Sequence, residues 1–189
     1  RRHLTDKPMQ ITGHTELIAH LGYPTHAFKA PMIYNPYFES AGINAVVVPM
    51  GCKPDLFPRL LPALFETTNM RGALITMPHK VSVVDLLDEV TPTVRVAGAC
   101  NAVRREADGR LVGDMFDGEG FVRGLKTKGF DPKGCRALVV GAGGLGAPLL
   151  QYLAAAGIDL GRDYPAPIVE HDAARAKTLE RYAVLKAAR

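Results

Sequence analysis

The stretch Ala137-Leu-Val-Val-Gly141-Ala-Gly143-Gly-Leu-Gly146 decides the fold of this chain of 189 residues. Four apolar residues predict a strand, and the glycines after it come directly before a predicted helix at 147–156. In that context the first glycine permits a tight turn, the second lets the backbone approach a pyrophosphate, and the third lets helix and strand pack closely. The free N–H groups at the helix N-terminus also attract phosphate. We therefore expect a dinucleotide to bind along Gly141, Ala142, Gly143, Gly144, Leu145 and Gly146.

A second predicted strand, Ile168-Val-Glu170, ends in an acidic residue. A carboxylate at this place in a nucleotide-binding unit binds the ribose diol and repels a 2′-phosphate. Of the two cofactors NAD and NADP, Glu170 therefore favours NAD, although a solvent-facing glutamate after a strand has the same pattern. A doubly wound domain needs about two βαβαβ halves, and this sequence holds little more than one βαβ unit, so we expect an incomplete Rossmann domain.

Upstream of residue 117, short apolar runs alternate with helical patterns, which is typical of an α/β fold. Strands are predicted at 10–21, 45–50, 73–77, 101–105 and 110–114. Helices are predicted at 31–41, 55–66, 81–87 and 117–129, the last as a connector between two domains. We expect an N-terminal α/β substrate-binding domain at 1–116, followed by an NAD(P)-binding Rossmann domain at 117–189.

The composition indicates a soluble, cytoplasmic protein. Hydrophobic residues make up 47% of the chain, which is enough for a buried core. No apolar run reaches the length of about 18 residues that crosses a membrane. The N-terminal residues lack the apolar segment of a signal peptide. The net charge of +4 is concentrated in the last 17 residues, where a solvated helix face explains it better than a nucleic-acid patch. We expect neither a membrane nor a nucleic-acid partner.

Cysteines and histidines give no metal site. Cys52, Cys100 and Cys135 form no CxxC pair, and the histidines show no metal-ligand spacing. Cys100 is a weak candidate for a nucleophile, because no other residue pattern supports it. Three reduced, mostly buried thiols are the simpler interpretation.

Lys80 and Asp117 are the candidate catalytic pair. Lys80 ends the run Leu74-Ile-Thr-Met-Pro-His-Lys80, and Asp117 lies on a separate loop. A lysine ammonium in a cleft can give a proton to a forming alkoxide, and a carboxylate can orient that ammonium. A surface salt bridge is the simpler alternative. We expect His79 to be structural and to pack beside Pro78.

Taken in order, these segments resemble the shikimate/quinate dehydrogenases over nearly the whole chain. The matching stretches are Gly22-Tyr-Pro24, Pro31 to Asn35, Thr76 to Lys80, Gly98 to Asn101, Gly113, Asp117 to Phe121 and Gly141 to Gly146. The resemblance implies an NAD(P)-dependent oxidoreductase of the shikimate pathway, which acts on a small cyclic hydroxy acid in a cleft between two domains. It implies Lys80 and Asp117 as the catalytic pair, and Thr76 and Asn101 as ligands of the substrate's ring hydroxyls. It leaves a homodimer open.

The departures from the family lie in the substrate pocket. The family usually has two serines before the proline matched by Pro31, and they bind the substrate carboxylate. Here those positions are Phe28 and Ala30, and each lost hydrogen bond to a charged group costs about 1.5–3 kcal/mol. Leu74 also replaces an asparagine, so we expect a more apolar pocket. Lys29 is our candidate for a replacement substrate contact, and a substrate with a less polar group at that end is the alternative.

Two other functions stay open. The glycine turn also resembles the nucleotide loop of the adenylating enzymes that activate ubiquitin-like and sulfur-carrier proteins, but it lacks their downstream cysteine and CxxC pairs. A non-catalytic binding or sensor module would keep the fold and lose turnover.

Overall fold

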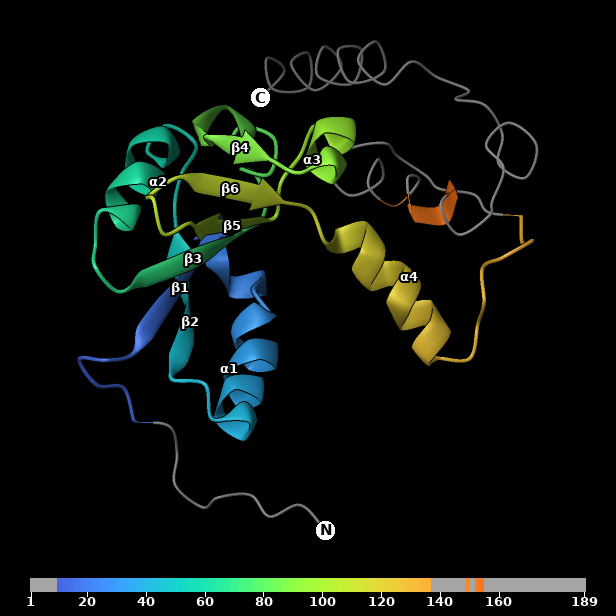
Figure 1. Ribbon diagram of the computed structural model, residues 1–189, viewed down its shortest axis with the longest axis horizontal. Helices are drawn as coiled ribbons and strands as arrows, with labels where there is room; N and C mark the ends of the chain where they lie inside the picture. The colour runs from blue at the N-terminus through green and yellow to red at the C-terminus, as the bar shows by residue number, and fades with distance from the viewer. Residues whose placement is uncertain (1–9, 137–148, 150–151, 155–189) are drawn as a thin grey trace, which may run out of the picture. The chain divides into compact units, whose positions relative to one another are not determined.

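The computed structural model describes residues 10–136, Leu149 and residues 152–154 (Figure 1). The chain divides into two compact units, Arg1–Phe116 and Asp117–Arg189, and each is described by itself. The glycine turn at 141–146 and Glu170 lie outside the described residues. The dinucleotide site and the assignment of the units as substrate and cofactor domains therefore remain predictions.

A sheet of six strands forms the first unit. In chain order, β1 to β6 span Glu16–Gly22, Ala45–Gly51, Met70–Ile75, Glu89–Val90, Ala102–Arg105 and Leu111–Asp114. Across the sheet the order is β2-β1-β3-β5-β6-β4. β1 is parallel to β2 and β3, β5 is antiparallel to both of its neighbours, and β4 is parallel to β6. The α/β fold class is confirmed.

Helices connect the strands of this unit. They are α1 (Ala30–Ala41), the 3-10 turn η1 (Thr25–Ala27), α2 (Phe57–Phe65), the 3-10 turn η2 (Val84–Leu86) and α3 (Pro92–Ala97). Each of the three α-helices has a proline in its first turn, where the missing N–H would have no helical partner. Gly42 and Gly98 end α1 and α3 in the left-handed conformation that glycine adopts without steric cost.

The helices cover both faces of the sheet and make three layers (Figure 1). Successive side chains of a strand point to opposite faces. Ala19 and Leu21 of β1 therefore belong to the larger core, with Phe57 and Leu61 of α2. Ile18 packs on the other face, in the smaller core built around Phe38 of α1, Ala45 and Val47.

The five strands predicted upstream of residue 117 are confirmed with shifted ends, and those predicted at 137–140 and 168–170 lie outside the described residues. The helix predicted at 81–87 is wrong. That segment is a series of turns that closes in η2. Val81, Val83 and Val84 are β-branched and lose rotamer freedom in a helix, which weakens helix propensity here. The 3-10 and α-type bonds from Val84 to Val81 and from Val83 to His79 tie the segment back to the preceding turn instead.

The described part of the second unit is short. α4 (Asp117–Thr127) confirms the helix predicted from residue 117. Its Val122 packs with buried Leu153 and with the partly buried Leu149 and Tyr152, which lie in the predicted helix at 147–156.

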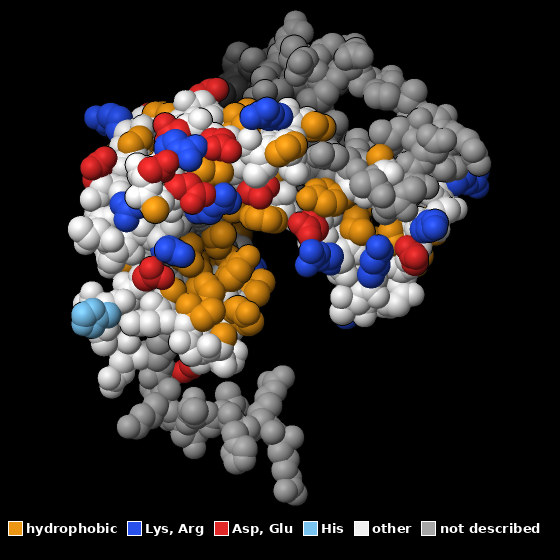
Figure 2. Space-filling model, viewed as in Figure 1, with side chains coloured by type: hydrophobic (Ala, Val, Ile, Leu, Met, Phe, Trp, Pro, Cys, Tyr) orange, Lys and Arg blue, Asp and Glu red, His pale blue; other side chains and the backbone are white. Residues whose placement is uncertain are grey.

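α1 has an unusually apolar exposed face. Met32, Ile33 and Tyr37 are 70%, 66% and 60% exposed, and Figure 2 shows hydrophobic side chains gathered over this helix. None of the helices that the structure describes is long and apolar enough to cross a membrane.

Candidate active site

Two of the three predicted substrate residues, Thr76 and Asn101, lie at one edge of the sheet in the first unit. The carboxyl ends of the parallel strands β1 and β3 lie at this edge, and antiparallel β5 begins there. Thr76 directly follows β3, and Asn101 directly precedes β5. The backbone joins these two ends, because Ile75 N–H donates to the Asn101 carbonyl at 2.8 Å. Residues 25 positions apart in sequence are thereby brought to one place.

The turn at 76–80 sets the backbone of Lys80. His79 N–H donates to the Thr76 carbonyl at 2.9 Å and closes the turn. Cys100 N–H donates to the Lys80 carbonyl at 2.8 Å, so the residue before Asn101 holds the residue proposed for proton transfer. Lys80 is half-buried. The main-chain positions of Thr76, Lys80 and Asn101 are therefore fixed relative to one another.

The buried side chain of His79 anchors this turn to the core. Its ring is 1% exposed and stacks on Phe57 with a centroid distance of 4.0 Å and an interplanar angle of 1°. Its Nε2 lies 2.7 Å from the Cys52 carbonyl oxygen, and the distance identifies the Nε2–H tautomer as the donor. This packing gives His79 the structural role that was expected. Its ring stacks on Phe57, whereas we expected it to pack beside Pro78.

Asn101 also orders the chain that leads to Asp117. Its Oδ1 accepts a hydrogen bond from Phe116 N–H at 3.0 Å, and its own N–H donates to the Asp114 carbonyl at 3.0 Å. Asp117 is the next residue and begins α4 in the second unit. The pairing of Asp117 with Lys80 stays a prediction.

Gly22 ends β1 at the same edge, and three neighbouring residues crowd the position that a Cβ would occupy. An added Cβ would lie 2.7 Å from the Met77 carbonyl oxygen, 2.9 Å from Phe28 Cζ and closer still to the Thr76 methyl group. Only glycine fits without displacing these atoms. The Phe28 ring tip and the Thr76 side chain therefore lie together above Gly22.

His20 supports Phe28 from the sheet. The two ring centroids are 4.1 Å apart, and His20 is 7% exposed. Burial lowers the pKa of His20 from its ordinary value, so the imidazole is neutral at pH 7. Its buried Nδ1 has no hydrogen-bond partner among the residues that the structure describes. His20 was not predicted as a site residue, because no local pattern in β1 indicates that its ring contacts Phe28.

Lys29, predicted as a substrate contact, is exposed and occupies the N-cap position of α1. A cation is not stabilised at that end of a helix, because the helix dipole is positive there. The structure places Lys29 next to Phe28 in the chain, and its contact with substrate remains a prediction.

Cys100 is unsuited to act as a nucleophile. It is fully buried, and burial raises the pKa of its thiol to about 11. The thiolate that nucleophilic attack requires is therefore scarce at neutral pH. Among the described residues, no group of three or more His, Cys, Asp or Glu side chains could hold a metal ion.

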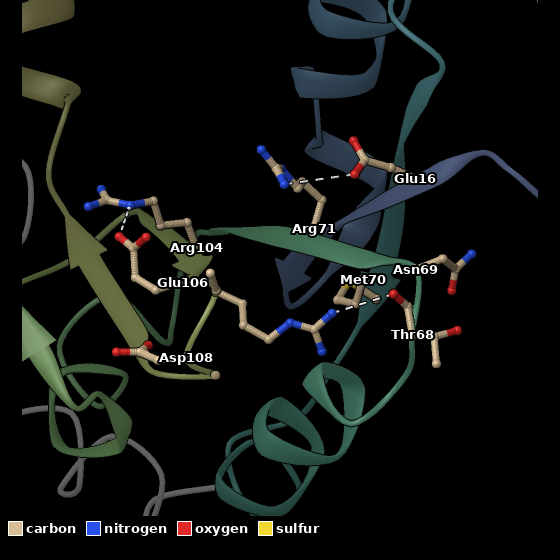
Figure 3. A pocket seen from close by; sticks show the side chains of 11 residues that line it. Glu16, Thr68, Asn69, Met70, Arg71, Arg104, Glu106 and Asp108 are labelled. Carbon is tan, nitrogen blue, oxygen red and sulfur yellow. Dashed lines mark hydrogen bonds and ion pairs between the residues drawn. The ribbon is translucent and has the colours of Figure 1, made fainter.

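A hollow of about 960 Å³ lies at the opposite edge of the sheet (Figure 3). It is lined by the start of β3 and by the turn between β5 and β6, and it contains none of the predicted site residues. Its three arginines have acceptors: Arg71 pairs with Glu16 at 3.9 Å, Arg104 pairs with Glu106 at 2.7 Å, and Arg105 donates to backbone carbonyls of the loop before β3. These contacts are internal to the fold and indicate no particular ligand.

Comparison with known proteins bears on the edge that carries Thr76, Lys80 and Asn101. Residues 21–103, which include all three, match the family model of the shikimate dehydrogenase substrate binding domain. The shikimate dehydrogenase (NADP(+)) of Geobacter metallireducens is 39% identical over 150 residues, which are 79% of this chain and 52% of that protein. The chain thus spans about half the length of the curated relatives it matches.

Solved structures show the same likeness. Shikimate 5-dehydrogenase from Listeria monocytogenes, in complex with shikimate and NAD, is 31% identical with a TM-score of 0.73, covering 79% of this chain and 51% of that one. The ligand-free 5-ketofructose reductase of Gluconobacter sp. strain CHM43 is 28% identical with a TM-score of 0.69, covering 77% of this chain and 52% of that one.

Proposed function

We propose that this chain, which belongs to the shikimate dehydrogenase family through its substrate-binding segment at 21–103, is part of an NAD(P)-dependent oxidoreductase. The reaction transfers hydride between a nicotinamide and a secondary alcohol or ketone of a small cyclic hydroxy acid or related compound. The observation that carries the proposal is the gathering of Thr76, Lys80 and Asn101 at one sheet edge inside the matched segment.

The proposed chemistry divides between the cofactor and the chain. The turn predicted at 141–146 would hold the pyrophosphate of the dinucleotide, and the nicotinamide would accept or supply the hydride. During oxidation the hydroxyl proton of the alcohol passes to Lys80, which Asp117 orients and whose charge it balances. During reduction the Lys80 ammonium returns that proton to the forming alkoxide. Thr76 and Asn101 would hold neighbouring hydroxyls and so fix the position of the carbon that exchanges hydride.

The central test is loss of turnover at Lys80. Lys80→Met keeps an unbranched side chain, one atom shorter, and removes the amine that transfers the proton, so kcat should fall by about 10²–10⁴ with a smaller change in KM. Asp117→Asn should also lower kcat. Lys128→Met removes an exposed lysine after α4 and is the matched control. Full kcat in Lys80→Met would refute the proposed role of that residue.

The cofactor is a nicotinamide dinucleotide, and we propose NAD as the preferred one. The Geobacter metallireducens relative is a shikimate dehydrogenase (NADP(+)), and the Listeria structure holds NAD, so both cofactors occur among similar proteins. The preference for NAD rests on Glu170, whose carboxylate would repel a 2′-phosphate. Glu170→Ala should raise kcat/KM for NADP relative to NAD. An unchanged ratio, or NADP preferred by the unaltered protein, would overturn this preference.

Two alternative functions make different predictions. An adenylating enzyme would exchange pyrophosphate with ATP, and we expect no exchange. A non-catalytic module would bind the dinucleotide without oxidising or reducing any member of a broad alcohol and ketone panel. Oxidation or reduction of any panel member would exclude that module.

The remaining expectations concern the protein in solution. A homodimer stays a prediction, and light scattering of the purified protein measures it directly. The cytoplasmic location also stays a prediction.

A further inference from the structure

We propose that His20 and Phe28 determine the substrate class and select an uncharged polyhydroxy ketone or alcohol over a carboxylate. This inference rests on the proposed function, since it names the substrate of the same site. It is carried by the packing of His20, Gly22, Phe28 and Thr76 at the carboxyl ends of β1 and β3.

Phe28 places an apolar ring beside Thr76. Its ring tip and the Thr76 side chain would both touch a Cβ placed on Gly22, so phenyl ring and threonine are neighbours at the sheet edge. A substrate whose hydroxyl reaches Thr76 must therefore lie near the Phe28 ring. A phenyl ring offers no hydrogen bond to a carboxylate, and an ionised carboxylate placed against it loses water without compensation.

Support for the Phe28 ring comes from His20 of β1. The His20 ring packs against the Phe28 ring in a tilted arrangement with a centroid distance of 4.1 Å, and His20 is paired with Leu74 in the β1–β3 register. The His20 imidazole is held neutral by burial, so it supplies no positive charge to balance an anion. His20 of β1, its register partner Leu74 of β3 and the Phe28 ring that contacts His20 are therefore all uncharged.

Lys29 is the cation nearest to Phe28 in the sequence. Lys29 follows Phe28 but has an exposed side chain at the N-cap of α1. An exposed lysine is strongly hydrated and flexible, and it replaces two short hydroxyl donors poorly. The fold itself is compatible with an uncharged substrate, because a neighbour at 28% identity is a 5-ketofructose reductase.

The experiment uses the full protein with NAD and NADP, and with shikimate and 5-ketofructose as the acidic and uncharged probes. We expect kcat/KM for 5-ketofructose to exceed that for shikimate by at least about tenfold, because Phe28 and Ala30 offer the carboxylate no side-chain hydrogen-bond donor. Phe28→Ser combined with Ala30→Ser should shift the ratio toward shikimate by about tenfold or more, mainly through KM. Tyr37→Ser changes an exposed aromatic residue of α1 and should leave the ratio unchanged.

His20 is tested as a positioning residue through the aromatic contact. His20→Val removes the support for Phe28 and should raise KM for the uncharged probe with little change in kcat. His20→Phe keeps a ring on the strand and should restore KM. A kcat loss equal to the KM change, or no rescue by His20→Phe, would contradict this role.

The other outcomes are also decisive. Preference of the unaltered protein for shikimate, with a KM that rises about tenfold in Lys29→Ala, would overturn the proposal and assign the carboxylate to Lys29. If no member of the alcohol and ketone panel is oxidised or reduced, both probes included, the proposed function fails. Calorimetric binding of the two probes then decides the inference separately, because tighter binding of shikimate would overturn it and tighter binding of 5-ketofructose would support it.

Discussion

At the scale of single residues, Gly22 is the point on which the candidate site is packed. An added methyl group would overlap the Thr76 methyl group and would lie 2.7 Å from a backbone oxygen, which cannot move without displacing the turn. Gly22→Ala should therefore cost about 1–3 kcal/mol in the free energy of unfolding, as overpacked cores do. Urea denaturation measures this change.

The matched control is Gly13→Ala. Nothing lies within 4 Å of a Cβ at Gly13, so the free energy of unfolding should change by less than about 0.5 kcal/mol. Equal effects of the two substitutions would show that the crowding at Gly22 does not exist in solution.

Cys100 gives a second prediction at this scale. With its thiol buried and its pKa raised to about 11, Cys100 should not react with iodoacetamide in the native protein at pH 8. Cys135 is more exposed and should be alkylated first. Mass spectrometry of peptides from briefly treated protein identifies the modified residue. Early alkylation of Cys100 with loss of activity would restore it as a candidate nucleophile.

At the scale of elements, the sequence predicted what local chemistry decides and missed what distant partners decide. The run at 45–50 became β2 because its β-branched residues suit a strand wherever it lies. β4 holds only Glu89 and Val90, and it exists because β6 lies beside it. The turns at 81–87 likewise depend on His79, whose burial against Phe57 no local pattern reveals.

The same division holds in the candidate site. Thr76, Lys80 and Asn101 were predicted because family motifs carry them, and the sheet then brought their backbones together. The ring contact between His20 and Phe28 was not predicted, since it joins a strand to the loop that follows it. A contact of this kind depends on the path of the loop after β1. The alternation of polar and apolar residues along β1 does not specify that path.

His79 allows the element that carries Lys80 to be tested. His79→Phe keeps an aromatic ring on Phe57 but leaves the Cys52 carbonyl without its donor, which should cost about 1–3 kcal/mol in the free energy of unfolding. His79→Ala also loses the ring and should cost more. Turnover should fall with the displacement of the turn, and more in the alanine variant. Equal stability of both variants and the unaltered protein would show that His79 does not anchor the turn.

At the scale of the whole molecule, all residues of the two cores of the first unit precede the second unit in the sequence. The residues of the larger core end at Met115, and those of the smaller core lie between Ile18 and Leu74. All six strands fall in the same span. We therefore predict that residues 10–116 fold alone, because a domain of about 100 residues can bury enough surface to be stable. A single cooperative transition in urea, coincident by circular dichroism and fluorescence, is the expected result. A gradual loss of signal would mean that the first unit needs residues beyond Phe116, and the division into two domains would then be wrong as a folding boundary.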